Sequence, residues 1–379
     1  MKKRAALIIK QPLNASARPD YVLLALVLGL AGFGLFMVYD ASVVVAVNSF
    51  GNKYHYLQVQ GVNLVIGLGA LLVAARVDYN FWRKLAPLGL LVGLFLLMAV
   101  FVPGLGYEQY GARRWLDLRV TKLQPAYVLC FAMIVYLSSW LSREGADRHS
   151  WQRGLLPFSV LLGLVMLVVV VLQKDLGSGL ILALTCLNLY FLSGSPLKHL
   201  GLLAPGGLAA AGLFILIEPY RMKRLFSFMD RSQDTGGSSY HINQVLIALG
   251  SGGWLGVGLG QSRQKYDYIP EVQTDSIFAI LGEELGFVGS VVLVSTFCYL
   301  IWRGMRIAMR APDMFGRLLA SGIMAFVGIQ LFVNLFAMAA LIPLTGVPLP
   351  FISNGGTSLI VLLFSMGIVL NISKQAEAA

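Results

Sequence analysis

The chain has 379 residues, of which 57% are hydrophobic and 12% are charged. Soluble domains carry about 25% charged residues, so this composition excludes a soluble globular enzyme, a disordered chain and a disulfide-stabilised secreted domain. The three cysteines have no C-x-x-C spacing and the four histidines are dispersed, so neither a disulfide framework nor a protein-built transition-metal site is indicated. A polytopic helical membrane protein remains, with an unusual formal net charge of +11.

Apolar segments of the length needed to cross a bilayer recur along the whole chain. A bilayer core about 30 Å thick needs about 20 apolar residues per helix. The segments are 21–39, 60–76, 86–102, 124–141, 155–172, 176–193, 199–217, 277–302, 318–341 and 356–372. We therefore predict an all-α polytopic membrane fold of about ten helices, with a tight interfacial turn at 173–175. The first segment exceeds a signal-peptide core and no small-residue cleavage site follows it, so we predict a retained helix.

The positions of lysine and arginine predict the orientation, because cytoplasmic loops carry an excess of both. With the N-terminus in the cytoplasm, 17 of the 29 cations fall in cytoplasmic segments. Both termini are therefore predicted to be cytoplasmic. The predicted organisation is an N-terminal segment at 1–20, one membrane domain at 21–373 and a tail at 374–379.

Ten of the twelve outer cations gather in two segments. They are Arg113, Arg114, Arg119 and Lys122 in the first, and Arg221, Lys223, Arg224, Arg231, Arg263 and Lys265 in the second. One interpretation is that long loops are translocated whatever their charge. The other is a basic outer-face site for an anionic ligand, such as a phosphate-bearing lipid headgroup.

The second basic segment lies in a large outer loop, 218–275, between the seventh and eighth predicted helices. Loops longer than about 12–15 residues are usually functional or disordered. Residues 242–249 read I-N-Q-V-L-I-A-L, which is typical of a helix apolar enough to lie at the membrane interface. A run of glycines interleaved with tryptophan and leucine follows.

Asp275 stands at the end of this loop. A helix is predicted to begin at Ser276, which places Asp275 at its N-cap. An acidic cap is one interpretation; the other is a carboxylate at the outer face that accepts a proton or holds a divalent cation. Glu283 and Glu284 lie about two turns further in, where charged groups are normally paired, so a structural role is favoured for both.

Two arginine-containing motifs flank predicted helices. Arg221 and Arg224 directly follow the seventh helix, and are either a pyrophosphate-binding pair or interfacial anchors. Arg114 precedes Trp115 shortly before the fourth helix, but an interfacial tryptophan is common for purely physical reasons. The Arg114–Trp115 pair is therefore a weak signal by itself.

A proline-rich turn opens the last predicted helix. Its sequence includes Ser353, the pair Gly355 and Gly356, and Ser358. Such a turn can expose backbone N–H groups at a helix N-terminus, which bind anions readily. A simple turn with serine capping is the alternative.

These motifs, in this order, resemble the SEDS family (shape, elongation, division and sporulation), meaning the RodA, FtsW and SpoVE proteins. The strongest strings are G-W-L-G-V-G-L-G-Q-S-R-Q-K at 253–265, I-P-E-V-Q-T-D-S-I-F-A at 269–279, G-E-E-L-G at 282–286 and L-P-F-I-S-N-G-G-T-S at 349–358. Supporting matches are Asp175 in D-L-G, the Gln330/Asn334 pair, Y-R-x-x-R at 220–224, R-W at 114–115 and Q-P at 124–125. The resemblance covers nearly the whole chain.

The resemblance implies the SEDS fold and a peptidoglycan glycosyltransferase for cell-wall elongation or division. Such an enzyme polymerises lipid II into β-1,4 glycan strands by an inverting displacement of undecaprenyl pyrophosphate. Asp275 matches the family's essential outer-face aspartate and is the predicted catalytic base. The predicted substrate-binding residues are Arg221, Arg224, Lys265, Arg114, Trp115, Ser353, Gly355, Gly356 and Ser358. The predicted supporting residues are Asp175, Glu283, Glu284, Gln330 and Asn334.

The implied surroundings are the bacterial plasma membrane, with the active site on the outer face. The implied partners are lipid II, a class B penicillin-binding protein and other elongation or division proteins, and no nucleic acid. No resident cofactor is predicted with certainty, and a divalent cation at Asp275, Mg²⁺ or Mn²⁺, stays open. A lipid II flippase and an inactive scaffold for the penicillin-binding protein are the alternatives.

Several positions depart from the family pattern. After Gln124-Pro125 the family usually continues with Ser-Glu and then a lysine, whereas this chain has Ala126, Tyr127 and Cys130. The contribution of the fourth helix to the site is therefore in question. The other departures are Gln273 for a histidine, and Lys174 and Arg231 for prolines.

Overall fold

The computed structural model describes residues 18–109, 112–117, 122–143, 145, 147–229, 237–266 and 268–376. The N-terminal segment up to residue 17, Arg119 and Arg231 lie outside these residues. The long helices are α1 (Tyr21–Phe50), α2 (His55–Arg76), α3 (Tyr79–Ala99), α4 (Pro125–Leu141), α5 (Leu156–Met166), α6 (Leu176–Leu192), α7 (Leu197–Ile217), α10 (Ile277–Met309), α11 (Met314–Met338) and α12 (Gly356–Ala376). Two further helices, α8 (Pro219–Met229) and α9 (Ser238–Ser251), lie between α7 and α10.

The described residues contain eight helices that are long and apolar enough to cross a membrane. One of them is the continuous stretch Trp151–Leu172, in which π-helical segments flank α5. Two shorter apolar helices, α4 and α6, lie among the eight. The polytopic helical fold is thus confirmed, and the ten predicted segments each correspond to one of these helices.

The turn predicted at 173–175 is present, since α6 begins at Leu176. Asp175 is its N-cap, and the Asp175 Oδ1 accepts a hydrogen bond of 3.1 Å from the backbone N–H of Ser178. An acidic N-cap satisfies a backbone donor that the helix itself leaves free.

A small antiparallel sheet between α3 and α4 was not predicted. Its strands are β1 (Gly106–Gln109), β2 (Ala112–Asp117) and β3 (Lys122–Leu123), in the order β1-β2-β3. Leu116 of β2 packs on Val100 at the end of α3 and anchors the sheet to the bundle.

The centre of the bundle is formed by α11 and α12, which are the most buried of the long helices. The helix α2 packs along α12 at close range. At Gly367 an added Cβ would lie 2.3 Å from the carbonyl oxygen of Leu71, so only glycine permits this approach. Small residues let helices meet closely in membranes, where packing rather than the hydrophobic effect holds them together.

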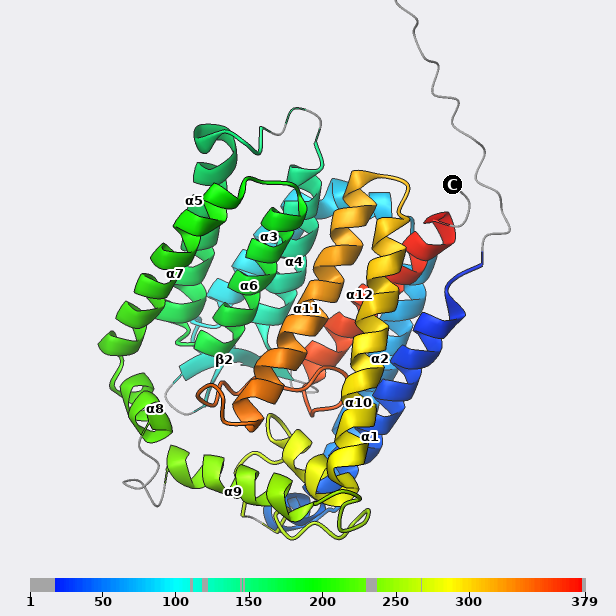
Figure 1. The fold of residues 1–379 in the computed structure, drawn as a ribbon, viewed down its shortest axis with the longest axis vertical. Helices are drawn as coiled ribbons and strands as arrows, with labels where there is room; N and C mark the ends of the chain where they lie inside the picture. The colour runs from blue at the N-terminus through cyan, green and yellow to red at the C-terminus, as the bar shows by residue number, and fades with distance from the viewer. Residues whose placement is uncertain are drawn as a thin grey trace, which may run out of the picture.

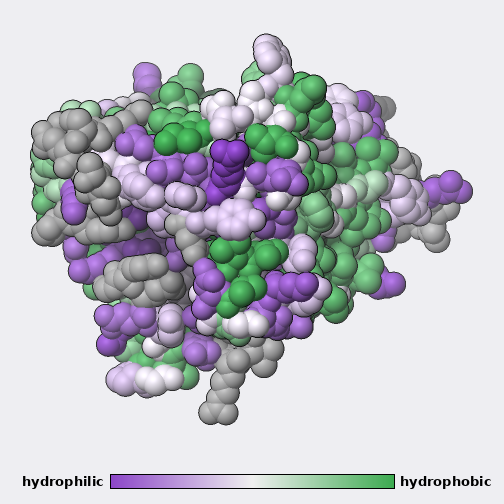
Figure 2. All heavy atoms as spheres, turned by 90° about the horizontal axis from the view of Figure 1, so that it is seen from below, coloured by the Kyte–Doolittle hydropathy of each residue, from purple (hydrophilic) through white to green (hydrophobic). Residues whose placement is uncertain are grey.

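The two ends of the bundle differ. At one end the start of α1 meets the ends of α10 and α12: Arg303 pairs with Asp20 at 2.8 Å, and the Asp20 N–H donates to Ser373 Oγ at 3.0 Å. The opposite end carries the sheet, α8, α9 and the loop that precedes α10 (Figure 1). Viewed from that end, hydrophilic side chains gather across the middle of the face and apolar ones along one side (Figure 2). We call it the loop end.

The helix α10 is broken at Gly286, whose φ of 67° and ψ of −164° are open essentially to glycine alone. The freed backbone groups bond to the glycine run. Val257 and Gly258 donate to the carbonyls of Glu283 and Glu284 at 3.0 and 3.1 Å, and the N–H groups of residues 287 and 288 donate to the carbonyls of residues 253 and 254. A Cβ at Gly256 would lie 2.0 Å from the Glu284 carbonyl oxygen, so the glycines allow the backbones to meet.

Candidate active site

Asp275 lies at the loop end, directly before α10. The predicted N-cap role is wrong: Ser276 is the cap residue, helix α10 begins at Ile277, and the described residues provide no side-chain cap bond there. The Asp275 carboxylate is partly exposed. Only long hydrogen bonds reach its Oδ1 in the described part of the chain, from the hydroxyls of Thr274 and Ser276 at 3.5 and 3.4 Å. The carboxylate is therefore not used to cap the helix.

Two amide side chains of α11 hold the surroundings of Asp275. Asn334 Nδ2 donates to the Asp275 carbonyl and to the Val347 carbonyl, both at 2.8 Å. Gln330 Nε2 donates to the Pro348 carbonyl at 3.0 Å and to Ser358 Oγ at 3.2 Å. Asn334 thus joins the loop before α12 to the backbone of Asp275, and Gln330 joins that loop to the first turn of α12. The supporting role predicted for both residues stays a prediction.

The electrostatic environment changes the acidity of Asp275. The pKa of its carboxyl group is raised from 3.8 to about 6, first by burial and then by the negative charge of Glu271, whose effect is larger than the opposite effect of the positive charge of Arg224. Arg224 is fixed by a 2.8 Å hydrogen bond to the Leu344 carbonyl. A carboxylate with a pKa near the working pH is suited to accept a proton.

We expect the rate of any reaction that uses Asp275 as a base to fall below about pH 6, because the carboxylate fraction falls there. Glu271→Gln removes a charge that raises this pKa, so the acid limb of the pH–rate profile should move to lower pH. Glu108→Gln changes an exposed carboxylate at the same end and should leave the limb in place. If the acid limb of the pH–rate profile did not move in Glu271→Gln, the assignment of Asp275 as the base would be contradicted.

Arg114, Arg221 and Asp175 form a second group. Arg221 is buried and donates to the Val170 and Phe214 carbonyls at 2.6 and 2.9 Å. Arg114 donates to the Lys174 carbonyl at 2.6 Å. Arg114 thus bonds to the backbone of the 173–175 turn, whereas Arg221 bonds to the backbone of the preceding π-helical segment and of α7. The predicted contact of both guanidinium groups with a phosphate stays a prediction. Trp115 lies beside Arg114 on β2, half-buried.

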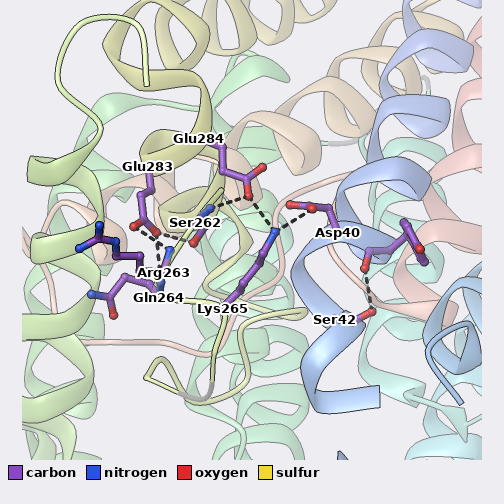
Figure 3. A network of polar contacts seen from close by, with 9 residues as sticks. Asp40, Ser42, Ser262, Arg263, Gln264, Lys265, Glu283 and Glu284 are labelled. Carbon is purple, nitrogen blue, oxygen red and sulfur yellow. Dashed lines mark hydrogen bonds and ion pairs between the residues drawn. The ribbon is translucent and has the colours of Figure 1, made fainter. Parts of the chain in front are cut away.

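Lys265 belongs to a third group, on the side of α1 (Figure 3). Its ammonium group pairs with Asp40 of α1 at 2.9 Å and with Glu284 at 3.1 Å, and it is 5% exposed. Glu283 accepts hydrogen bonds from the Ser262 hydroxyl and from the backbone N–H of Arg263 at 3.1 Å. Glu284 is thus paired with a cation, as expected, and Glu283 is bound by hydrogen bonds.

The proline-rich turn before α12 is tied to its neighbours on every side. The Ser353 hydroxyl accepts from the Leu349 N–H at 2.8 Å, and the Ser353 carbonyl accepts from Gln60 at 3.2 Å. Helix α12 begins at Gly356, where a Cβ would lie 2.6 Å from the side chain of Asn63 of α2. Gly355, just before the helix, leaves more room: a Cβ there would lie no closer than 3.5 Å to its neighbours.

Comparison with known proteins then places the chain. The FtsW/RodA/SpoVE family, described as cell cycle proteins, matches residues 21–378. The chain belongs to this family. Stage V sporulation protein E of Bacillus subtilis (strain 168) is 40% identical over 361 residues, covering 95% of this chain and 98% of that protein. A probable peptidoglycan glycosyltransferase FtsW of Geobacter sulfurreducens is 40% identical over 364 residues, with coverages of 96% and 97%.

Solved structures of FtsW/RodA/SpoVE proteins have the same architecture. The chain matches one described as the structural coordination of polymerization and crosslinking by a peptidoglycan synthase complex, with a TM-score of 0.74, 27% identity and coverages of 94% and 97%. It matches the rod shape determining protein RodA of Thermus thermophilus with a TM-score of 0.67, 26% identity and coverages of 96% and 98%. The family's fold is therefore this chain's fold.

The departures from the FtsW/RodA/SpoVE pattern are accommodated inside the bundle. Ala126, Tyr127 and Cys130 are all buried in α4. Gln124 Nε2 donates to the Asp175 Oδ2 at 2.9 Å, so Asp175 has a neutral partner from the start of α4. Gln273 is buried, and its carbonyl accepts from the Asn354 N–H at 2.8 Å.

Several residues near Asp275 were missed by sequence reasoning. His241 of α9 hydrogen-bonds with Ser276 Oγ at 2.7 Å, and burial, with the charge of Arg224, lowers the pKa of its imidazole to about 4. Gly346, with a φ of +70°, has its Cβ position 4.0 Å from Asp275 Oδ2. A lone histidine and a lone glycine carry no spacing signal, so only the fold could reveal them.

Proposed function

We propose that this chain is a peptidoglycan glycosyltransferase that polymerises lipid II into β-1,4 glycan strands. The chain is 40% identical, over nearly its full length, to an FtsW protein that is named as a probable peptidoglycan glycosyltransferase. This similarity supports the activity. The single observation that carries the mechanism is the partly exposed carboxylate of Asp275, with its pKa raised to about 6 beside Arg224.

Asp275 acts as the general base. Its carboxylate accepts the proton of the acceptor's 4-hydroxyl, and the oxygen forms a bond to C1 of the donor sugar. The bond from C1 to undecaprenyl pyrophosphate breaks, and its electron pair leaves with the pyrophosphate. One displacement converts the α-linked donor into a β-1,4 linkage.

The leaving pyrophosphate gains negative charge as the bond breaks, and fixed cations stabilise such charge in a partly dry site. Arg224 is the cation whose charge acts on Asp275, so it is the first candidate for this role. Arg224, Arg114, Arg221 and Lys265 all donate to protein acceptors, so each would act through the field that it creates.

A divalent cation is compatible with the Asp275 surroundings. Glu271 and Asp275 share the Thr274 hydroxyl, whose distances to their carboxylate oxygens are 3.4 and 3.5 Å, so two carboxylates face one small region. The described residues contain no cluster of three or more His, Cys, Asp or Glu side chains that could hold a metal ion. Two carboxylates suit Mg²⁺, which keeps water and shares substrate phosphate oxygens. When bound, the ion would supply compensation of the pyrophosphate charge.

The proposed setting is the bacterial plasma membrane, with both termini cytoplasmic and the loop end outside. The excess of lysine and arginine in the short loops at the end that carries the termini supports this orientation. The proposed partner is a class B penicillin-binding protein, which would cross-link the strands. The structural match to a complex that couples polymerization and crosslinking supports such a partner.

The test is a polymerisation assay. The full-length chain, purified with its partner and with the transpeptidase blocked, is incubated with labelled lipid II and Mg²⁺, and the products are resolved by gel. We expect glycan strands. Their absence from the intact complex, with movement of lipid II between leaflets of a vesicle, would instead favour transport. If neither glycan strands nor movement of lipid II were detected, an inactive scaffold would be favoured.

A further inference from the structure

A positively charged pocket lies at the end of the bundle opposite Asp275. Arg18 before α1 and Arg303, Arg306 and Arg310 of α10 line it, together with Asp20 and the end of α12, around a volume of about 240 Å³. Four arginines face one aspartate, which leaves three positive charges uncompensated among the lining residues that the structure describes.

The arginines differ in how they are held. Arg303 Nε donates to both carboxylate oxygens of Asp20 at 2.8 Å, so this ion pair is held in one geometry at the edge of the pocket. The Arg306 guanidinium lies over the ring of Trp302, 4.8 Å from its centroid, which sets its direction. Arg18 and Arg310 are exposed. The pocket therefore offers two exposed cations and one oriented cation around a fixed ion pair.

A membrane-facing groove begins beside this pocket. It runs between α1 and α10, which lie side by side (Figure 1), and has a volume of about 650 Å³. Its lining is almost entirely apolar, and includes Tyr21, Gly29 and Phe33 of α1 and Leu285 and Thr296 of α10. Tyr21 of the groove directly follows Asp20 of the pocket, so the two spaces border each other along the same pair of helices.

We propose that the pocket and the groove together bind one anionic glycerophospholipid, with the phosphate headgroup among the arginines and an acyl chain between α1 and α10. A basic pocket between membrane helices, opening on an apolar cleft, has the chemistry of such a lipid. The arginine forks suit phosphate oxygens. A free anion would leave the groove without an occupant, and a neutral lipid would leave the three charges without a partner.

The expected position of the pocket in the cytoplasmic leaflet favours this occupant, because anionic phospholipids are abundant there. Neither lining includes Asp275: the pocket lies at the other end of α10 from the loop, and the groove reaches α10 as far as Leu285. The bound lipid would fill the space between α1 and α10 without contacting the reacting sugars. It would thereby stabilise the pair of helices that also carries Asp40 and Glu284.

The headgroup is tested by native mass spectrometry on the full chain, delipidated in non-ionic detergent and titrated with phosphatidylglycerol or phosphatidylcholine. We expect tighter binding of phosphatidylglycerol, reduced about fivefold per arginine in Arg306→Gln/Arg310→Gln. The matched control is Arg143→Gln/Arg317→Gln, which removes two exposed cations outside the pocket. A thermal unfolding curve in detergent checks the fold of each variant.

The acyl chain is tested at two glycines of α1 whose Cβ positions are both open. Gly29 lines the groove and Gly32 does not, and neither has an atom within 4 Å of an added Cβ. Gly29→Leu should fill the groove and weaken phosphatidylglycerol binding, whereas Gly32→Leu should not. Equal binding of the two lipids, or equal losses in the arginine variants and their control, would overturn the headgroup site. Equal behaviour of the two glycine variants, or tighter binding of a polyprenyl phosphate, would overturn the diacyl occupant.

Discussion

Replacing Asp275 by asparagine is expected to slow glycan polymerisation roughly 10²- to 10⁴-fold, the usual contribution of a general base. The amide keeps the size of the carboxyl group but cannot accept the proton of the acceptor hydroxyl. The fold should persist, because Asn334 bonds the backbone carbonyl of Asp275 rather than its side chain. The measurement is the initial rate of strand formation from labelled lipid II, with the melting temperature as a check.

Asp117→Asn is the matched control, because it neutralises an exposed aspartate on β2 at the same end. It should polymerise at the rate of the unchanged chain. If Asp275→Asn kept that rate while the intact chain made strands, Asp275 would not be the base but the activity would stand. If neither the intact chain nor Asp275→Asn made strands, the result would count against the polymerase activity itself.

Replacing Lys265 by methionine is expected to destabilise the protein by about 3–5 kcal/mol, the usual cost of removing one partner of a buried ion pair. The side chains of Lys265, Asp40 and Glu284 are 6%, 13% and 0% exposed. Without the ammonium group, two carboxylates would lie close together with no cation between them. The measurement is the free energy of unfolding in mixed detergent.

Lys174→Met is the control, since Lys174 pairs with Glu218 at 3.0 Å but the two side chains are 46% and 28% exposed, far more than those of the buried triad. Exposed pairs contribute about 0–1 kcal/mol, so little change is expected. Adding Asp40→Asn and Glu284→Gln to Lys265→Met should recover part of the loss. Equal stability of the Lys265 and Lys174 variants would mean that the buried triad contributes nothing.

Hydropathy alone predicted the membrane helices, because a spanning helix must be apolar over a length set by the bilayer. It failed where polar groups are satisfied by partners distant in sequence. Helix α1 continues to Phe50, beyond the predicted end at 39, across Asp40. That aspartate is tolerated because Lys265, from a loop far along the chain, pairs with it. The sheet was missed because its strands of four, six and two residues are too short for an alternating pattern.

The sequence predicted which segments form the candidate site, but not the role of each residue in it. The strings around Asp275 and before α12 located the elements that meet there, through the family resemblance. The individual roles depend on geometry that a sequence does not contain. Arg221 has the composition of a ligand-binding residue, yet its guanidinium is buried against backbone carbonyls. Likewise, Asp275 lies one residue before the actual cap of α10, and sequence rules do not predict helix boundaries to within one residue.

The bonds across the break in α10 have a topological consequence. They join residues 253–258 to residues 283–288, and so close the intervening chain into a ring that contains Asp275. Residues 287 and 288, which begin the membrane-spanning part of α10, are bonded to this ring as well. The loop that carries Asp275 is therefore held to α10 on both sides of the break at Gly286.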